Sequence, residues 1–100
     1  ISRADLMSML TQTVFPCAVY QNYGKAIAEQ TYTPAGFKLA LGLKDVTLAL
    51  QTAADAHMPM PLASLLHDRL MTGVAKGREE MDWSALALGV SEDAGIAPNH

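Results

Sequence analysis

Apolar residues recur at helical spacing along most of the chain, and the longest such stretch covers residues 34–57. At about 100° per residue, one narrow stripe of this predicted helix collects Phe37, Leu41 and Leu48. Lys44 projects onto the middle of the stripe and Asp45 onto its edge. The opposite side carries Leu39, Leu43, Val46, Leu50 and Ala53. A helix that is apolar on two sides is normally buried between other elements.

A lysine on such a face needs a specific environment. Lys44 must reach an edge of the helix, pair with an acid, or point into a cavity that needs positive charge. Periodicity alone does not separate an ordinary surface lysine from one that serves a binding site.

Start and stop signals predict shorter helices before and after the long one. Ser2 is a candidate N-cap for a first helix that ends before Pro16. A second helix is predicted from Pro16 or Cys17 to about Ala28. Thr33 followed by Pro34 is typical of a helix start, so the long helix is expected to begin there.

Two prolines, Pro59 and Pro61, end the long helix. A fourth helix is then predicted from about Leu62 to Lys76, and Asp82 caps a last short helix from Trp83 to about Leu88. Residues 1–90 are therefore expected to form one helical domain, and residues 91–100 a polar tail.

The composition agrees with this all-α prediction, because the chain is rich in Ala, Leu and Met and has no alternating apolar runs. One hundred residues suffice for one modest core. Half of the residues are hydrophobic, which is more than such a core can bury and indicates a partner surface. No apolar run reaches the roughly 18–20 residues of a membrane span.

Charge and candidate ligands exclude several function classes. A net charge of −3 with scattered Lys and Arg argues against a nucleic-acid surface. The three histidines lack paired ligand spacing, so no metal site is predicted.

Cys17 is the single cysteine, so it cannot form an internal disulfide and is expected to be a buried small residue in a reducing, cytoplasmic protein. The first residues lack both an initiator Met and a signal-peptide pattern, so we expect a longer parent protein.

Three segments carry family-like motifs: residues 37–50, FKLALGLKDVTLAL, residues 58–62, MPMPL, and residues 77–86, GREEMDWSAL. The first is similar to the F-x-x-x-L-x-x-K-D-x-x-L-A-L segment of the β-hydroxyacid dehydrogenase family, which includes 3-hydroxyisobutyrate dehydrogenase, tartronate semialdehyde reductase and glyoxylate/succinic semialdehyde reductases. The second resembles that family's turn into the next helix, and the third resembles its G-x-x-x-x-D-[FWY]-S-A-L segment. Asn22-Tyr23-Gly24 and Thr33-Pro34 before Phe37 also fit. The order and spacing of these pieces are jointly specific.

The resemblance implies a C-terminal all-α domain of the 6-phosphogluconate dehydrogenase-like type, with about five helices and the long helix 34–57 at its centre. The family's Rossmann domain and its catalytic lysine would then lie upstream of Ile1, and a glycine-rich G-x-G-x-x-G turn is absent. Phe37, Lys44 and Asp45 match family residues that line the cleft near nicotinamide and substrate. Phe37 would supply an apolar wall, and Lys44 would donate to the substrate carboxylate or the cofactor ribose. Asp45 would orient Lys44 or cap a neighbouring hydrogen bond.

By this resemblance, the chain is expected to close the cleft and build the dimer interface of an oxidoreductase. The cofactor would be NAD or NADP, held mainly by the Rossmann domain, and the substrate a small carboxylate such as a hydroxy acid or its semialdehyde. The parent is expected to be a cytoplasmic homodimer or homotetramer, with no membrane or nucleic-acid partner, and this chain alone to be inactive. An imine reductase-like member and a free-standing helical dimerisation module remain alternatives.

Overall fold

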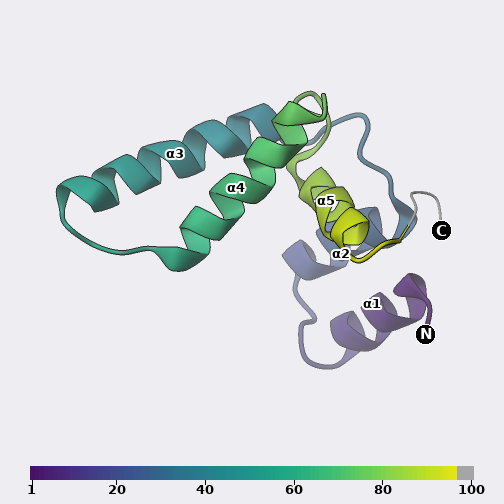
Figure 1. Cartoon of the computed structure of the whole chain (residues 1–100). Coiled ribbons are helices and arrows are strands. Elements are labelled where there is room, and N and C mark those ends of the chain that lie inside the picture. Colours follow the sequence, from purple (N-terminus) through teal and green to yellow (C-terminus); the bar gives the residue numbers. More distant parts are fainter. Residues whose placement is uncertain (97–100) are drawn as a thin grey trace.

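The computed structural model describes residues 1–96, and this part of the chain is helical, as the sequence predicts. Its elements are α1 (Arg3–Gln12), α2 (Ala18–Glu29), α3 (Leu39–Asp55), α4 (Pro61–Ala75), the short 3-10 helix η1 (Trp83–Ala85) and α5 (Leu86–Asp93). Figure 1 shows α3 and α4 as an antiparallel hairpin that extends to one side, with α1, α2 and α5 on the other. The Cα trace measures 43 × 31 × 25 Å.

The first helix begins where its cap predicts. The Ser2 hydroxyl accepts a hydrogen bond from the backbone N–H of Asp5 at 3.1 Å, which satisfies one of the free donors of the first turn. The helices α2 and α4 also lie within two residues of their predicted bounds. Local signals therefore suffice for these three elements.

The start of the long helix is a correction, because α3 begins at Leu39 and not at Pro34. Residues 34–38 lie instead against the segment that precedes η1. The carboxylate of Asp82 accepts from the N–H of Gly36 at 3.0 Å and from that of Phe37 at 2.9 Å. These hydrogen bonds from a distant segment override the local Thr33-Pro34 signal.

The buried core lies where α3, α4 and η1 meet. Its members are Tyr32, Leu39, Leu70 and Ala85, and Leu39 has no exposed surface. Gly73 on α4 lets the two hairpin helices approach, since a Cβ there would stand 2.7 Å from a Leu39 methyl carbon. Tyr32 lies in the connector between α2 and α3, but it is only 6 % exposed and its carbonyl accepts from the N–H of Asp82 at 2.9 Å.

Only one side of α3 is packed, so the expectation of burial on both sides is wrong for this chain. Leu39 and Ala53 are buried on the inner side. On the other side, the two leucines of the predicted stripe, Leu41 and Leu48, are 47 % and 52 % exposed. These two leucines therefore face outward and are uncovered, whereas Phe37, the third residue of the predicted stripe, lies before α3 and packs against Trp83.

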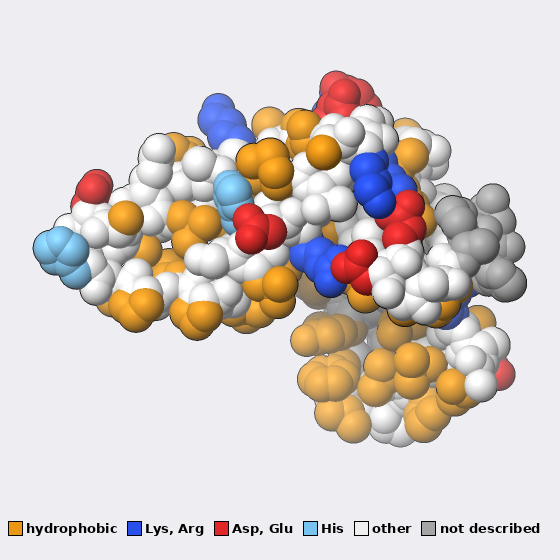
Figure 2. Space-filling view, in the orientation of Figure 1, with side chains coloured by type: hydrophobic (Ala, Val, Ile, Leu, Met, Phe, Trp, Pro, Cys, Tyr) orange, Lys and Arg blue, Asp and Glu red, His pale blue; other side chains and the backbone are white. Residues whose placement is uncertain are grey.

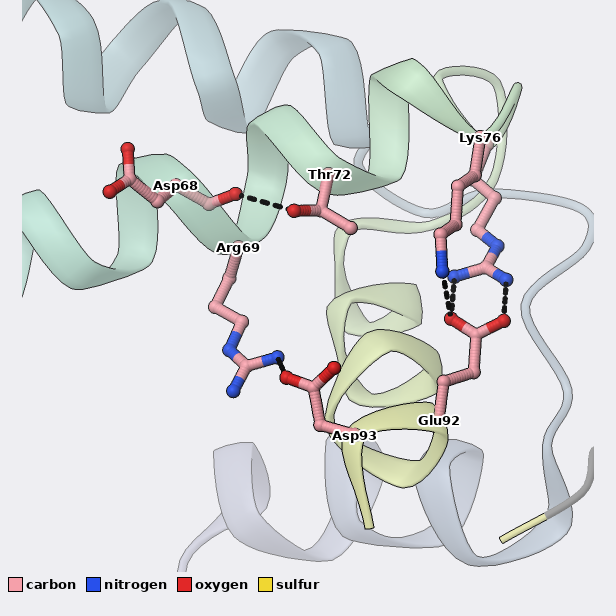
Figure 3. Close-up of polar contacts among 7 residues, drawn as sticks. Asp68, Arg69, Thr72, Lys76, Glu92 and Asp93 are labelled. Atoms are coloured by element: carbon pink, nitrogen blue, oxygen red, sulfur yellow. Dashed lines mark hydrogen bonds and ion pairs between the residues drawn. The ribbon is translucent and has the colours of Figure 1, made fainter. Parts of the chain in front are cut away.

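One ion pair joins α5 to α4, and a three-residue cluster joins α5 to the segment just after α4, as Figure 3 shows. The carboxylate of Glu92 accepts from Lys76 at 3.0 Å and from two nitrogens of Arg78 at 3.0 and 2.8 Å. Arg69 on α4 pairs with Asp93 on α5 at 2.5 Å, whereas its neighbour Asp68 contacts His67 at 3.0 Å. The helix thus continues to Asp93 through the start of the predicted tail, and the last part of that tail, residues 97–100, lies outside the described residues.

We expect Glu92→Gln to lower the melting temperature at neutral pH. Hydrogen bonds from Arg78 and Lys76 lower the pKa of Glu92 to about 2, from an ordinary 4.5. Since the folded carboxyl holds its proton less tightly than the unfolded one, its stabilisation is present above pH 4.5 and is lost as the pH falls towards 2. Calorimetry between pH 7 and about 2 should show that the difference in melting temperature between the wild type and Glu92→Gln vanishes at the lowest pH. Glu29→Gln, an exposed glutamate on α2, should track the wild type, and an undiminished deficit at acid pH would contradict the ion-pair account.

Exposed apolar side chains gather at two places on the surface. Figure 2 shows one group over the far end of the α3–α4 hairpin and another over α1 and its surroundings. The hairpin group comprises Leu48, Met58, Met60, Leu62, Leu65 and Leu66. Cys17, expected to be buried, is exposed at the turn before α2. Within residues 1–96, no helix combines the length and the apolar character needed to cross a membrane.

Candidate functional site: an aromatic-walled cavity beside the long helix

A cavity of about 380 Å³ opens between the start of α3, the middle of α4 and η1. Its lining is mostly apolar and consists of Phe37, Gly42, Asp45, Val46, Leu66, Leu70, Trp83 and Leu86. Asp45 is the single charged residue in that lining. An apolar hollow with few polar groups is the usual form of a small-molecule site.

Two aromatic rings form one wall of the cavity. The rings of Phe37 and Trp83 meet edge to face, with centroids 6.0 Å apart and planes at 88°. Gly42 on α3 faces both, because a Cβ at Gly42 would stand 3.5 Å from Trp83 Cβ and 3.6 Å from Phe37 Cε2. The ring of Trp83 also meets the ring of Tyr23 edge to face, with centroids 5.5 Å apart. Both residues line a second cavity of about 410 Å³ next to α2. Trp83 is therefore a partition between two hollows.

The indole N–H of Trp83 is buried and has no hydrogen-bond partner among the described residues. A buried donor without a partner costs stability, and such groups call for an explanation such as a ligand or an unseen water. The sequence pattern placed Trp83 only at the start of the last short helix and gave no signal for this donor.

Asp82 connects the aromatic wall to the rest of the fold. Its side chain is buried, and it accepts from the N–H groups of Gly36, Phe37 and Ser84 and from the Ser84 hydroxyl. Burial alone would raise the pKa of Asp82, but the hydrogen bonds from Ser84, Phe37 and Gly36 outweigh it and hold the pKa below its ordinary value. Asp82 is thus a charged acceptor for two separate segments.

The structure brings two of the three predicted site residues together. Phe37 and Asp45 line the same cavity, although they lie in different local structures, a loop and a helix. Lys44 is exposed on α3 and does not line this cavity. It lies on the uncovered face with Leu41 and Leu48.

No cluster of His, Cys, Asp and Glu within residues 1–96 could hold a metal ion. Of the three histidines, His100 lies outside the described residues. The cavity itself offers an apolar wall and one carboxylate, that of Asp45.

Comparison with known proteins identifies the chain's relatives. A family model described as "NAD-binding of NADP-dependent 3-hydroxyisobutyrate dehydrogenase" matches residues 1–89. The chain belongs to this family. The match includes Phe37, Lys44 and Asp45, and it extends over the segments 37–50, 58–62 and 77–86 on which the resemblance was based.

Of three curated relatives, one is named as an oxidoreductase and two as reductases. The chain is 46 % identical over 77 residues to an uncharacterized oxidoreductase, YfjR, of Bacillus subtilis, which is 77 % of this chain and 27 % of the relative. It is 34 % identical over 68 residues to 2-hydroxy-3-oxopropionate reductase of Escherichia coli (68 % of this chain, 23 % of the relative). It is 37 % identical over 60 residues to the 3-sulfolactaldehyde reductase of the same organism (60 % and 20 %). The chain thus spans about a quarter of the length of these relatives.

Proposed function

We propose that the chain works as the helical domain of an NAD(P)-dependent oxidoreductase that interconverts a small hydroxy acid and its semialdehyde. Its tasks are to close the cleft over the substrate and to build the dimer interface. The observation that supports this most is the shared cavity of Phe37 and Asp45 beside Lys44, in a chain of the 3-hydroxyisobutyrate dehydrogenase family. Two of the relatives are named as reductases of 2-hydroxy-3-oxopropionate and of 3-sulfolactaldehyde.

Lys44 suits the role of a cleft residue supplied to a neighbouring domain. Its ammonium stands on the uncovered face of α3, between the half-exposed Leu41 and Leu48. When a second domain covers this face, water leaves and the charge of Lys44 becomes available for a bound carboxylate or ribose. Asp45, at the cavity, then orients Lys44 or a hydrogen-bonding group of the ligand.

The nicotinamide cofactor supplies the hydride when it is bound. The residues present here fit a supporting role towards it, since the chain has no G-x-G-x-x-G turn to hold a pyrophosphate. We propose that another domain of the longer protein holds most of the dinucleotide and carries the catalytic lysine. The residue that separates a dehydrogenase from an imine reductase-like member would lie there as well.

The 100-residue chain alone is expected to bind NADH and NADPH more weakly than about 1 mM and to reduce no substrate. The reason is that it offers one ammonium and an open face, without the glycine-rich turn that neutralises a pyrophosphate. Calorimetric titration of the chain with both dinucleotides checks this, with the complete oxidoreductase as the positive control. Micromolar binding by the chain alone would contradict the proposed division of labour.

The chain is also expected to self-associate at micromolar concentration through the exposed apolar end of the α3–α4 hairpin. Burying several half-exposed leucines and methionines on a partner removes apolar surface from water at about 25 cal/mol per Å². Leu65 and Val14 are a test residue and its control, because both are exposed apolar side chains. Leu65 is 55 % exposed and lies on α4, whereas Val14 is 68 % exposed and lies beyond the end of α1. In sedimentation experiments, Leu65→Glu should weaken association and Val14→Glu should not. A monomer at all concentrations would contradict the interface assignment.

A further inference from the structure

Asp82 makes more hydrogen bonds than its place at the start of η1 requires. As a cap, it needs only the N–H of Ser84, which donates to Oδ2 at 3.0 Å, and the Ser84 hydroxyl binds the same oxygen at 2.5 Å. The other oxygen, Oδ1, is directed at a segment far away in the sequence. It accepts from Gly36 at 3.0 Å and from Phe37 at 2.9 Å. One carboxylate therefore joins η1 to the loop that precedes α3.

Phe37 is held on both sides of its backbone by this arrangement. Its N–H donates to Asp82, and its carbonyl accepts from the N–H of Trp83 at 2.7 Å. Its ring then stands edge to face with Trp83 at the wall of the cavity. Since Phe37 lies outside any helix, these contacts fix its place.

We propose that Asp82 is a positioning residue for substrate binding, which acts by holding Phe37 against Trp83 so that the two rings form one wall of the cavity. This inference rests on the proposed function, because it takes the cavity as part of the substrate cleft. Asp82 is buried behind the wall and does not line the cavity, so it acts through Phe37 and not on the substrate.

Replacement of Asp82 by asparagine separates this role from simple capping. An amide offers one acceptor oxygen and one donor nitrogen, whereas Asp82 accepts on both of its oxygens. In Asp82→Asn, the NH₂ group replaces one of the two acceptor oxygens. It therefore faces either the two donors of Ser84 or the N–H groups of Gly36 and Phe37, and the hydrogen bonds on that side are lost. The loop before α3 is then no longer held against η1. Phe37 then samples several positions, and the cavity wall is no longer preformed.

The experiment is a double-mutant cycle in the complete oxidoreductase, with Phe37→Ala, Asp82→Asn and the double variant. The probe substrates are 2-hydroxy-3-oxopropionate and 3-sulfolactaldehyde. The one with the higher kcat/KM in the wild-type enzyme is used, with NADPH and with NADH. We expect Asp82→Asn to raise KM by about tenfold, with a smaller change in kcat, because an apolar wall contacts ground state and transition state alike. Phe37→Ala should raise KM similarly. In the Phe37→Ala background, Asp82→Asn should change KM by less than about twofold, because the residue it positions is gone.

The control is Val74→Ala, which removes apolar atoms packed against the core cluster and lines neither cavity. It should lower the melting temperature and leave KM unchanged. If Asp82→Asn does not fold, Ser84→Ala takes its place in the cycle, since it removes one of the four hydrogen bonds and keeps the carboxylate. Its rise in KM should be smaller and should also disappear in the Phe37→Ala background.

The outcomes distinguish the two proposals. If Phe37→Ala leaves both KM and kcat unchanged, the cavity is not the substrate cleft, and the proposed function of Phe37 fails together with the inference. If Phe37→Ala raises KM but Asp82→Asn does not, the inference alone is overturned. It is also overturned if Asp82→Asn raises KM equally in both backgrounds, because Asp82 then acts by a route other than Phe37.

Discussion

Leu39→Ala is expected to lower the free energy of unfolding by about 3 kcal/mol, because it empties the centre of a small core. Leu39 has no exposed surface, and its methyl groups lie against Gly73 of α4, where even one added carbon would not fit. Gly73 has no side chain that could fill the space left by the leucine, so the cavity in the variant persists. Natural domains of this size have a net stability of only about 5–15 kcal/mol, so the loss is a large share.

Urea denaturation of the 100-residue chain measures this effect, and Leu41→Ala is the matched control. Leu41 lies two positions further along α3 but is 47 % exposed on the uncovered face. Its replacement should change the free energy of unfolding by less than about 0.5 kcal/mol. Equal losses in the two variants would show that the core does not lie between α3 and α4.

Lys44→Ala in the complete oxidoreductase is expected to reduce kcat/KM by roughly ten- to a hundredfold, which corresponds to the loss of one charge-assisted hydrogen bond of about 1.5–3 kcal/mol. The melting temperature should hardly change. Lys44 is exposed, and alanine favours helix at least as well as lysine. The kinetic and thermal effects should therefore separate.

Lys25→Ala on α2 is the control for this prediction, since Lys25 is also an exposed helical lysine but lies away from Phe37 and Asp45. It should leave kcat/KM unchanged. If Lys44→Ala instead shows normal kinetics together with a large fall in melting temperature, Lys44 has a structural role and does not belong to the cleft.

The helices that local signals define could be predicted from the sequence. The cap at Ser2, the break at Pro16 and the prolines before α4 act within a few residues, and α1, α2 and α4 follow them. The start of α3 could not be predicted in this way. The local pair Thr33-Pro34 favours a helix. Hydrogen bonds to Asp82 and Trp83, which lie far along the sequence, hold the residues that follow this pair in a loop instead.

The candidate site could be predicted in part. Family motifs pointed to Phe37 and Asp45, and the fold places both at one cavity, although their role in binding stays a prediction. Helical periodicity placed Lys44 on the same face as Leu41 and Leu48 but could not tell whether this face of the helix is buried in the core or uncovered. The contribution of Trp83 to the cavity wall depends on how η1 meets α3, which is a tertiary feature that no local pattern encodes.

The hydrogen bonds around Asp82 have a consequence for how this domain can vary. They join the residues just before α3 to those that follow α4, so the chain enters and leaves the α3–α4 hairpin at one place. The hairpin is therefore attached like an insertion, with both of its ends at a shared base (Figure 1). Its exposed tip, residues 56–60, can gain or lose residues without disturbing that base. The reach of the hairpin towards a partner and the shape of the cavity at its base can thus change independently.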